Sequence, residues 1–155
     1  MAARSRDVRR RVRRPSTRKA GGASSPVFLD TGIFIAFLDR SDRHHAQATA
    51  LFATPPRAWM TSLAVYSETW SWLLHRLGEE PARAFREMVE TLPSFELLEI
   101  TRARHAATLA ILDRLRGTKL TYVDASSLAF IESRRIPVVW STDRHLALTG
   151  ANVVP

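Results

Sequence analysis

Residues 27–38 read VFLDTGIFIAFL, and this stretch sets the pattern for the whole chain. The short apolar run Val27-Phe28-Leu29 predicts a buried strand that ends at Asp30. A turn at Thr31-Gly32 then leads into a short helix expected over 33–38. The same alternation of an apolar strand with a helix recurs to the end of the chain.

The expected elements follow from apolar runs and from the Pro and Gly residues that interrupt them. We expect helices over 44–52, 63–77, 81–92, 102–116 and 124–134, and further strands over 59–61, 95–100, 137–140 and 152–154. Strands that alternate with helices indicate a mostly parallel sheet covered by helices on both faces. The fold class is therefore α/β, and ligands are expected at the carboxyl ends of the strands.

Composition limits the kinds of chemistry that the protein can perform. The chain has 155 residues, of which 45% are hydrophobic and 25% are charged, as in a single globular domain. It contains no cysteine, which excludes a disulfide scaffold, a cysteine-ligated metal site and a thiol nucleophile. No stretch approaches the length of a membrane span, so we expect no membrane partner and a cytoplasmic location.

The positive charge is concentrated at the N-terminus. Residues 1–20 hold nine of the 23 basic residues and one of the 15 acidic residues, which accounts for the entire net charge of +8. We expect residues 1–25 to be a basic, disordered arm and linker, and residues 26–155 to be the folded domain. The arm is either a solvated leader, a transit peptide or a segment that grips nucleic-acid phosphates. Its candidate RNA-binding residues are Arg9, Arg10, Arg11, Arg13 and Arg14.

Four acidic residues lie where a site is expected. Asp30 and Asp143 follow expected strands, and Asp124 begins a helix at the same edge of the sheet. Glu68 lies on an apolar helical stripe, where an uncompensated carboxylate is costly. Each aspartate could instead cap a helix, and Glu68 could pair with an arginine such as Arg76 or Arg104.

Carboxylates that converge on one point repel each other unless a cation lies among them. Mg²⁺ or Mn²⁺ suits a set of hard oxygen ligands. Such ions activate water and stabilise charge on a phosphodiester during its hydrolysis. The four acids, Asp30, Glu68, Asp124 and Asp143, are therefore candidate catalytic and metal-binding residues of a phosphoryl-transfer enzyme.

Four segments resemble, in order, the motifs of PIN-domain proteins. They are 27–36 (VFLDTGIFIA), 63–68 (LAVYSE), 120–129 (LTYVDASSLA) and 137–146 (PVVWSTDRHL). The resemblance covers residues 27–155 and implies a PIN-like nuclease domain over 26–155. It implies a three-layer α/β/α sandwich with a five-stranded parallel sheet.

The resemblance also implies a function. Small single-domain PIN proteins resemble VapC-type toxin ribonucleases of toxin–antitoxin systems, so we expect a Mg²⁺- or Mn²⁺-dependent endoribonuclease, a hydrolase. Its expected partners are an RNA substrate, a cognate antitoxin and a second copy in a homodimer. The implied metal site is Asp30, Glu68, Asp124 and Asp143. Thr31 and Ser141 match positions that steady the acids, and Arg144 matches a position that meets substrate phosphate.

One position departs from the family pattern, and two other functions stay open. Gly32 stands where Ser or Asn is frequent, which removes one contact near the acids. The second hypothesis is a phosphatase of the haloacid-dehalogenase type. Such enzymes would be expected to have a second aspartate at the position of Gly32. The third hypothesis is a non-catalytic RNA-binding or scaffold protein that uses the basic arm.

Trp70 and Trp72 cannot both face one core, so one is either partly buried or lines a dimer or antitoxin groove.

Overall fold

The computed structural model describes residues 25–155. The expected arm and linker over 1–25 lies outside the described residues except for Ser25. The candidate RNA-binding residues Arg9, Arg10, Arg11, Arg13 and Arg14 lie outside them as well.

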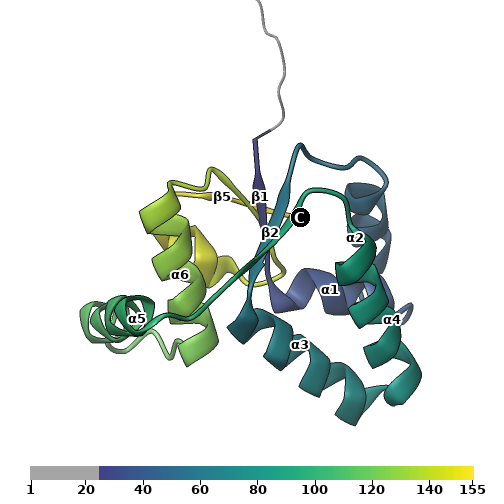
Figure 1. The fold of residues 1–155 in the computed structure, drawn as a ribbon, viewed down its shortest axis with the longest axis horizontal. Helices are drawn as coiled ribbons and strands as arrows, with labels where there is room; N and C mark the ends of the chain where they lie inside the picture. The colour runs from purple at the N-terminus through teal and green to yellow at the C-terminus, as the bar shows by residue number, and fades with distance from the viewer. Residues whose placement is uncertain (1–24) are drawn as a thin grey trace, which may run out of the picture.

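All strands of the described sheet are parallel. In chain order they are β1 (Val27–Leu29), β2 (Trp59–Ser62), β3 (Phe95–Leu98), β4 (Val138–Trp140) and β5 (Asn152–Val154). Their spatial order within the described residues is β3-β2-β1-β4-β5, with β1 at the centre (Figure 1). The chain builds outward from β1 to β3 and then resumes at β4 on the other side of β1. The carboxyl ends of the neighbouring strands β1 and β4 therefore form the switch point, where doubly wound sheets bind ligands.

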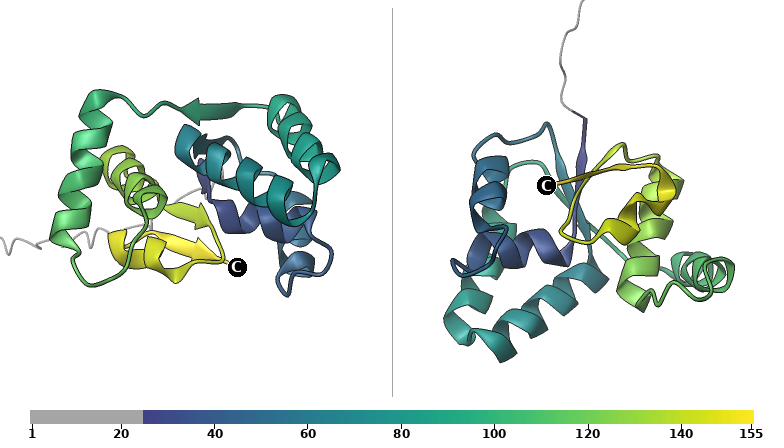
Figure 2. Two further views of the ribbon diagram at one scale, coloured as in Figure 1. Left: turned by 90° about the horizontal axis from the view of Figure 1, so that it is seen from below. Right: turned by 180° about the vertical axis from the view of Figure 1, so that it is seen from behind.

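Helices cover both faces of this sheet. In chain order they are α1 (Thr31–Leu38), α2 (His45–Phe52), α3 (Leu63–Arg76), α4 (Glu79–Thr91), α5 (Arg102–Arg114), α6 (Tyr122–Arg134) and the short 3₁₀ helix η1 (Arg144–Thr149). Figures 1 and 2 show α1 to α4 on one side of the strands and α5, α6 and η1 on the other. The expected three-layer α/β/α sandwich is confirmed.

The core lies where the apolar runs predict it. Residues Val27–Leu29 of β1 are all buried, as is typical of a central parallel strand covered on both faces. Beside β1, the rings of Phe52 and Trp59 stack 5.5 Å apart, and Trp140 meets Trp59 edge to face at 5.3 Å. This packing joins α2, the start of β2 and the end of β4.

The structure corrects several expected boundaries. Helix α1 begins at Thr31, so the expected turn at Thr31-Gly32 is its first turn. Helix α6 begins at Tyr122, two residues before Asp124, because Thr121 is its cap. Strand β3 ends at Leu98, α5 ends at Arg114, and η1 was not expected. Among the described residues, no helix has both the length and the apolar character that crossing a bilayer requires.

Candidate active site

Asp30 lies at the switch point and is the most buried of the candidate acids. It directly follows β1, and its backbone N–H donates to the carbonyl of Trp140 at the end of β4 (3.0 Å). Its side chain accepts a 2.7 Å hydrogen bond from the hydroxyl of Ser141. Asp30 occupies the N-cap position of α1, as the helix-cap alternative predicted, but its side chain makes no capping hydrogen bond to the helix.

The environment of Asp30 disfavours its charged form. The pKa of Asp30 is raised from 3.8 to about 6, chiefly by burial and to a smaller extent by the charges of Asp124 and Glu68. The Ser141 hydroxyl and the Thr31 amide act in the opposite direction, because both stabilise the carboxylate. Asp124 and Glu68 are thus the acids whose charges act on Asp30, and the membership of these three residues in one site stays a prediction.

Within residues 25–155, Glu68 is held by a hydroxyl group and not by an arginine. It lies half-buried on α3, and Thr31 of α1 donates a 2.5 Å hydrogen bond to its Oε2 atom. Arg104, one of the expected partners, donates instead to the carbonyl of Ala129 and to the Ser133 hydroxyl, both at 2.8 Å. Thr31 therefore orients the Glu68 carboxylate, while its role in a functional site stays a prediction.

Asp124 is fixed by the first turn of its own helix. The Thr121 amide donates to Asp124 Oδ2 (2.8 Å), and the Asp124 amide donates to the Thr121 hydroxyl (3.1 Å), which forms a capping box. Asp124 is thus the third residue of α6 and not its cap. The Thr-x-x-Asp spacing could have revealed this arrangement in the sequence.

Asp143 lies at the edge of the group. Its side chain caps η1 by accepting from the His145 amide (2.9 Å), and its Oδ1 atom lies 3.0 Å from His145 Nδ1. The helix-cap alternative is therefore correct for Asp143. Its backbone N–H donates to the Ser141 hydroxyl (2.9 Å), which in turn donates to Asp30. Asp143 is thus linked to Asp30 through Ser141, and its charge is not among those that shift the Asp30 pKa.

Gly32, in the first turn of α1, approaches Thr142 closely. A Cβ atom on Gly32 would lie 2.2 Å from the Thr142 hydroxyl oxygen and 3.2 Å from the Thr142 amide nitrogen. Only glycine leaves room for Thr142 here, which explains the departure at this position. Nothing in the spacing of the sequence indicated that residues 32 and 142 touch.

The chemistry of the carboxylates fits a divalent cation. In the described hydrogen bonds, one oxygen each of Asp30, Glu68 and Asp124 accepts from a protein donor, which fixes the orientation of the carboxylate for a ligand. Burial and mutual repulsion give a cation a favourable place among them. No group of three or more acidic or histidine side chains within residues 25–155 is already arranged at ligand distances.

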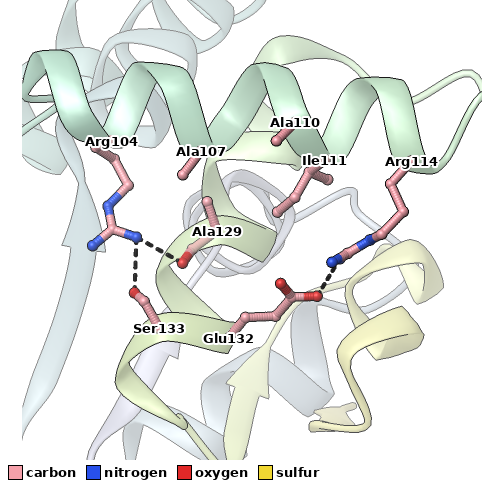
Figure 3. Close-up of a pocket in the computed structure, with 8 residues that line it drawn as sticks. All are labelled: Arg104, Ala107, Ala110, Ile111, Arg114, Ala129, Glu132 and Ser133. Atoms are coloured by element: carbon pink, nitrogen blue, oxygen red, sulfur yellow. Dashed lines mark hydrogen bonds and ion pairs between the residues drawn. The ribbon is translucent and has the colours of Figure 1, made fainter.

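One hollow of the surface lies apart from the candidate acids. A depression of about 450 Å³ runs between α5 and α6, with Ala107, Ala110 and Ile111 on its floor (Figure 3). At one end Arg104 binds Ala129 and Ser133, and at the other Arg114 pairs with Glu132. None of the candidate acids lines this depression.

Asp30 is a buried carboxylate at the switch point of a parallel sheet, the place where sheets of this class bind their ligands. The PIN domain matches residues 27–152, and the chain belongs to the PIN-domain family. The resemblance seen in the four sequence segments is confirmed.

The relatives are toxins of the VapC type. Over 130 residues the chain is 27% identical to the 23S rRNA-specific endonuclease VapC20 of Mycobacterium tuberculosis strain H37Rv, covering 80% of this chain and 94% of that protein. The crystal structure of M. tuberculosis VapC20, a sarcin–ricin-loop-cleaving toxin, superposes with a TM-score of 0.74 at 26% identity over 81% of this chain and 95% of that one. FitAcB from Neisseria gonorrhoeae shares the fold, with a TM-score of 0.60 at 16% identity over 83% of this chain and 96% of that one.

Proposed function

We propose that this protein is a ribonuclease that hydrolyses internal phosphodiester bonds of RNA with Mg²⁺ or Mn²⁺. The observation that carries the proposal is the buried Asp30 carboxylate, held by Ser141 and flanked by the charges of Glu68 and Asp124. Membership of the PIN-domain family and similarity to an rRNA endonuclease support it. They also favour it over a phosphatase and over a non-catalytic RNA-binding protein.

The proposed metal ligands are Asp30, Glu68 and Asp124, each through one carboxylate oxygen. A bound divalent ion would activate water and stabilise negative charge on the phosphate. Ser141 and Thr31 hold Asp30 and Glu68 in the orientation that a cation requires. Because burial already penalises the Asp30 charge, this carboxylate gains the most from a cation.

Asp143 and Arg144 are proposed to act at the edge of the site. The Asp143 carboxylate is held by His145, so we assign it to the positioning of water or of a solvated ion. The exposed Arg144 side chain, at the start of η1, is proposed to meet substrate phosphate. Arginine suits this role because its guanidinium presents several donors to an anion.

The biological role that we propose is that of a toxin neutralised by a cognate antitoxin, acting as a homodimer in the cytoplasm. Similarity to a VapC toxin supports this role.

A groove of about 380 Å³ on α3 and α4, lined by Tyr66, Ser67, Trp70 and Arg86, is a candidate contact for the antitoxin or the second copy. Both Trp70 and Trp72 are half-buried, as the partial-burial alternative predicted. Light scattering and co-purification with the product of an adjacent reading frame test these partners.

The basic arm over 1–25 is proposed to add nonspecific affinity for RNA. Arginines that neutralise phosphates release counterions, so binding should weaken steeply with salt. Removal of residues 1–24 should reduce this salt dependence while leaving the cleavage site in RNA unchanged. A transit peptide or an inert leader would leave RNA affinity unaltered by the truncation.

Cleavage of RNA by the purified protein tests the enzymatic assignment. Wild-type protein should cut 23S rRNA or a structured fragment of it with Mg²⁺ or Mn²⁺ and fail to do so in EDTA. Asp30→Asn and Asp124→Asn should lower the rate by about a hundredfold or more. Asp113→Asn is the matched control, because Asp113 is exposed and pairs only with Arg116 among the described side chains. Full activity of Asp30→Asn would overturn the assignment.

A further inference from the structure

Tyr122 and His105 form an exposed aromatic pair that the proposed catalytic machinery does not use. The Tyr122 hydroxyl and His105 Nδ1 share a hydrogen bond of 2.9 Å, and the ring centroids are 5.7 Å apart. Tyr122 is 36% exposed, and His105 is exposed as well. A hydrogen bond between two solvent-exposed side chains contributes little to folding stability, so the fold does not require this pairing.

The pair begins on the turn of helix that carries a candidate acid. Tyr122 is the first residue of α6 and Asp124 the third, so they lie about 3 Å apart along the helix axis, although side chains two positions apart on a helix point in different directions. Tyr122 lies between Thr121 and Asp124 in the sequence. The capping box that joins these two residues therefore fixes the backbone of Tyr122. The ring is therefore anchored to the same rigid turn as one of the proposed metal ligands.

The second half of the pair comes from the neighbouring helix. His105 lies on α5, which packs against α6 along the edge of the molecule (Figure 2). One turn further along α5, Leu109 is 44% exposed and extends the apolar surface. Arg102, one turn before His105, is exposed and brings a positive charge to the same face of the helix.

We propose that Tyr122 and His105 form a stacking platform for an unpaired nucleobase next to the scissile phosphate. This inference rests on the proposed ribonuclease function and adds a feature of the substrate, a single-stranded or looped RNA. Unstacked bases of loops pack on aromatic side chains, and this contact tolerates different bases because every base has a π-face. The hydrogen bond to His105 holds the tyrosine ring in place before RNA arrives, which reduces the ordering cost of binding.

The variants separate the ring from its hydroxyl. Tyr122→Ala removes the platform, Tyr122→Phe keeps the ring without the hydrogen bond to His105, and His105→Ala removes the partner. Leu74→Ala is the control, because Leu74 is 37% exposed on α3 and belongs to no proposed contact. The readouts are the affinity for a looped RNA by fluorescence anisotropy with Ca²⁺ present, and kcat and KM for its cleavage with Mg²⁺.

We expect Tyr122→Ala to weaken RNA binding and to raise KM by about 5- to 150-fold, the range that loss of one stacked base produces. Its kcat should stay within about twofold of wild type, since no proposed metal ligand is touched. Tyr122→Phe should bind nearly as well as wild type, and His105→Ala should fall between the two. Circular dichroism of each variant monitors the first turn of α6.

The possible outcomes separate this inference from the proposed function. Active wild-type protein with an unaltered KM in Tyr122→Ala overturns the platform and leaves the ribonuclease intact. RNA binding that depends on Tyr122 without any cleavage retains the platform and overturns the enzyme. Absence of both binding and cleavage in wild type overturns both. If Tyr122→Ala alters the oligomeric state and leaves RNA affinity unchanged, the surface belongs to a contact with a second copy of the chain, and the platform is overturned.

Discussion

Ionisation of Asp30 should cost the metal-free protein a measurable part of its folding stability. In the folded protein the pKa of Asp30 is raised from 3.8 to about 6, chiefly by burial. Between these values the folded state binds more protons than the unfolded state, so stability falls as the pH rises through this window. The full effect, about 3 kcal/mol, is reached above pH 6, where Asp30 is charged in both states.

Asp30→Asn isolates this effect. An asparagine carbonyl can still accept from Ser141, and no charge is buried at any pH. The free energy of unfolding of Asp30→Asn minus that of wild type, both in EDTA, should therefore increase by about 2 kcal/mol between pH 4 and pH 7. Urea denaturation at half-unit pH steps measures this difference. Asp113→Asn, at an exposed position, should show no such trend.

Addition of Mg²⁺ or Mn²⁺ at pH 7 should raise the free energy of unfolding of wild type and not that of Asp30→Asn. The reason is that a cation that binds only the folded state stabilises it by mass action. A difference in unfolding free energy that stays constant from pH 4 to pH 7 would refute the electrostatic account of Asp30. The same result would remove the reason for placing a cation beside it.

Three further changes probe how the site is held. Gly32→Ala should destabilise the fold by about 1–3 kcal/mol through its contact with the Thr142 hydroxyl, measured by urea denaturation. A second substitution, Thr142→Ala, removes that oxygen and should recover most of the loss; no recovery would contradict the steric explanation. Ser141→Ala deletes the hydrogen bond that lowers the pKa of Asp30, so the cleavage pH profile should move to higher pH and the rate should fall about 10- to 100-fold. Thr121→Ala removes a helix cap and should lower stability by about 1 kcal/mol, with an unchanged melting temperature as the contrary result.

The sequence predicts the sheet well because its strands are short apolar runs bounded by polar or turn-forming residues. Val27–Leu29 and Val138–Trp140 are covered on both faces, so each reads as a continuous apolar segment. Helix starts are predicted less well, since they depend on caps. The sequence pattern places Thr121 in the segment before α6, although its hydroxyl and the Asp124 carboxylate define the start of that helix.

The sequence names the candidate acids but not the contacts that hold them. Asp30 and Glu68 stand out because a carboxylate beside an apolar run is unusual. The hydrogen bond of Ser141 to Asp30 joins residues 111 positions apart, and no local pattern encodes such a contact. Whether Asp143 acts as a cap or as a ligand depends on the 3₁₀ turn and on His145, which are features of the folded chain.

The order of strands has a consequence for the synthesis of the protein. Strand β1 emerges first, yet it acquires its second neighbour, β4, only after about a hundred more residues have been translated. A nascent or prematurely terminated polypeptide that lacks β4 cannot bring Ser141 to Asp30. The arrangement of the acids is therefore completed only once β4 has been translated, and chains that stop before β4 lack it.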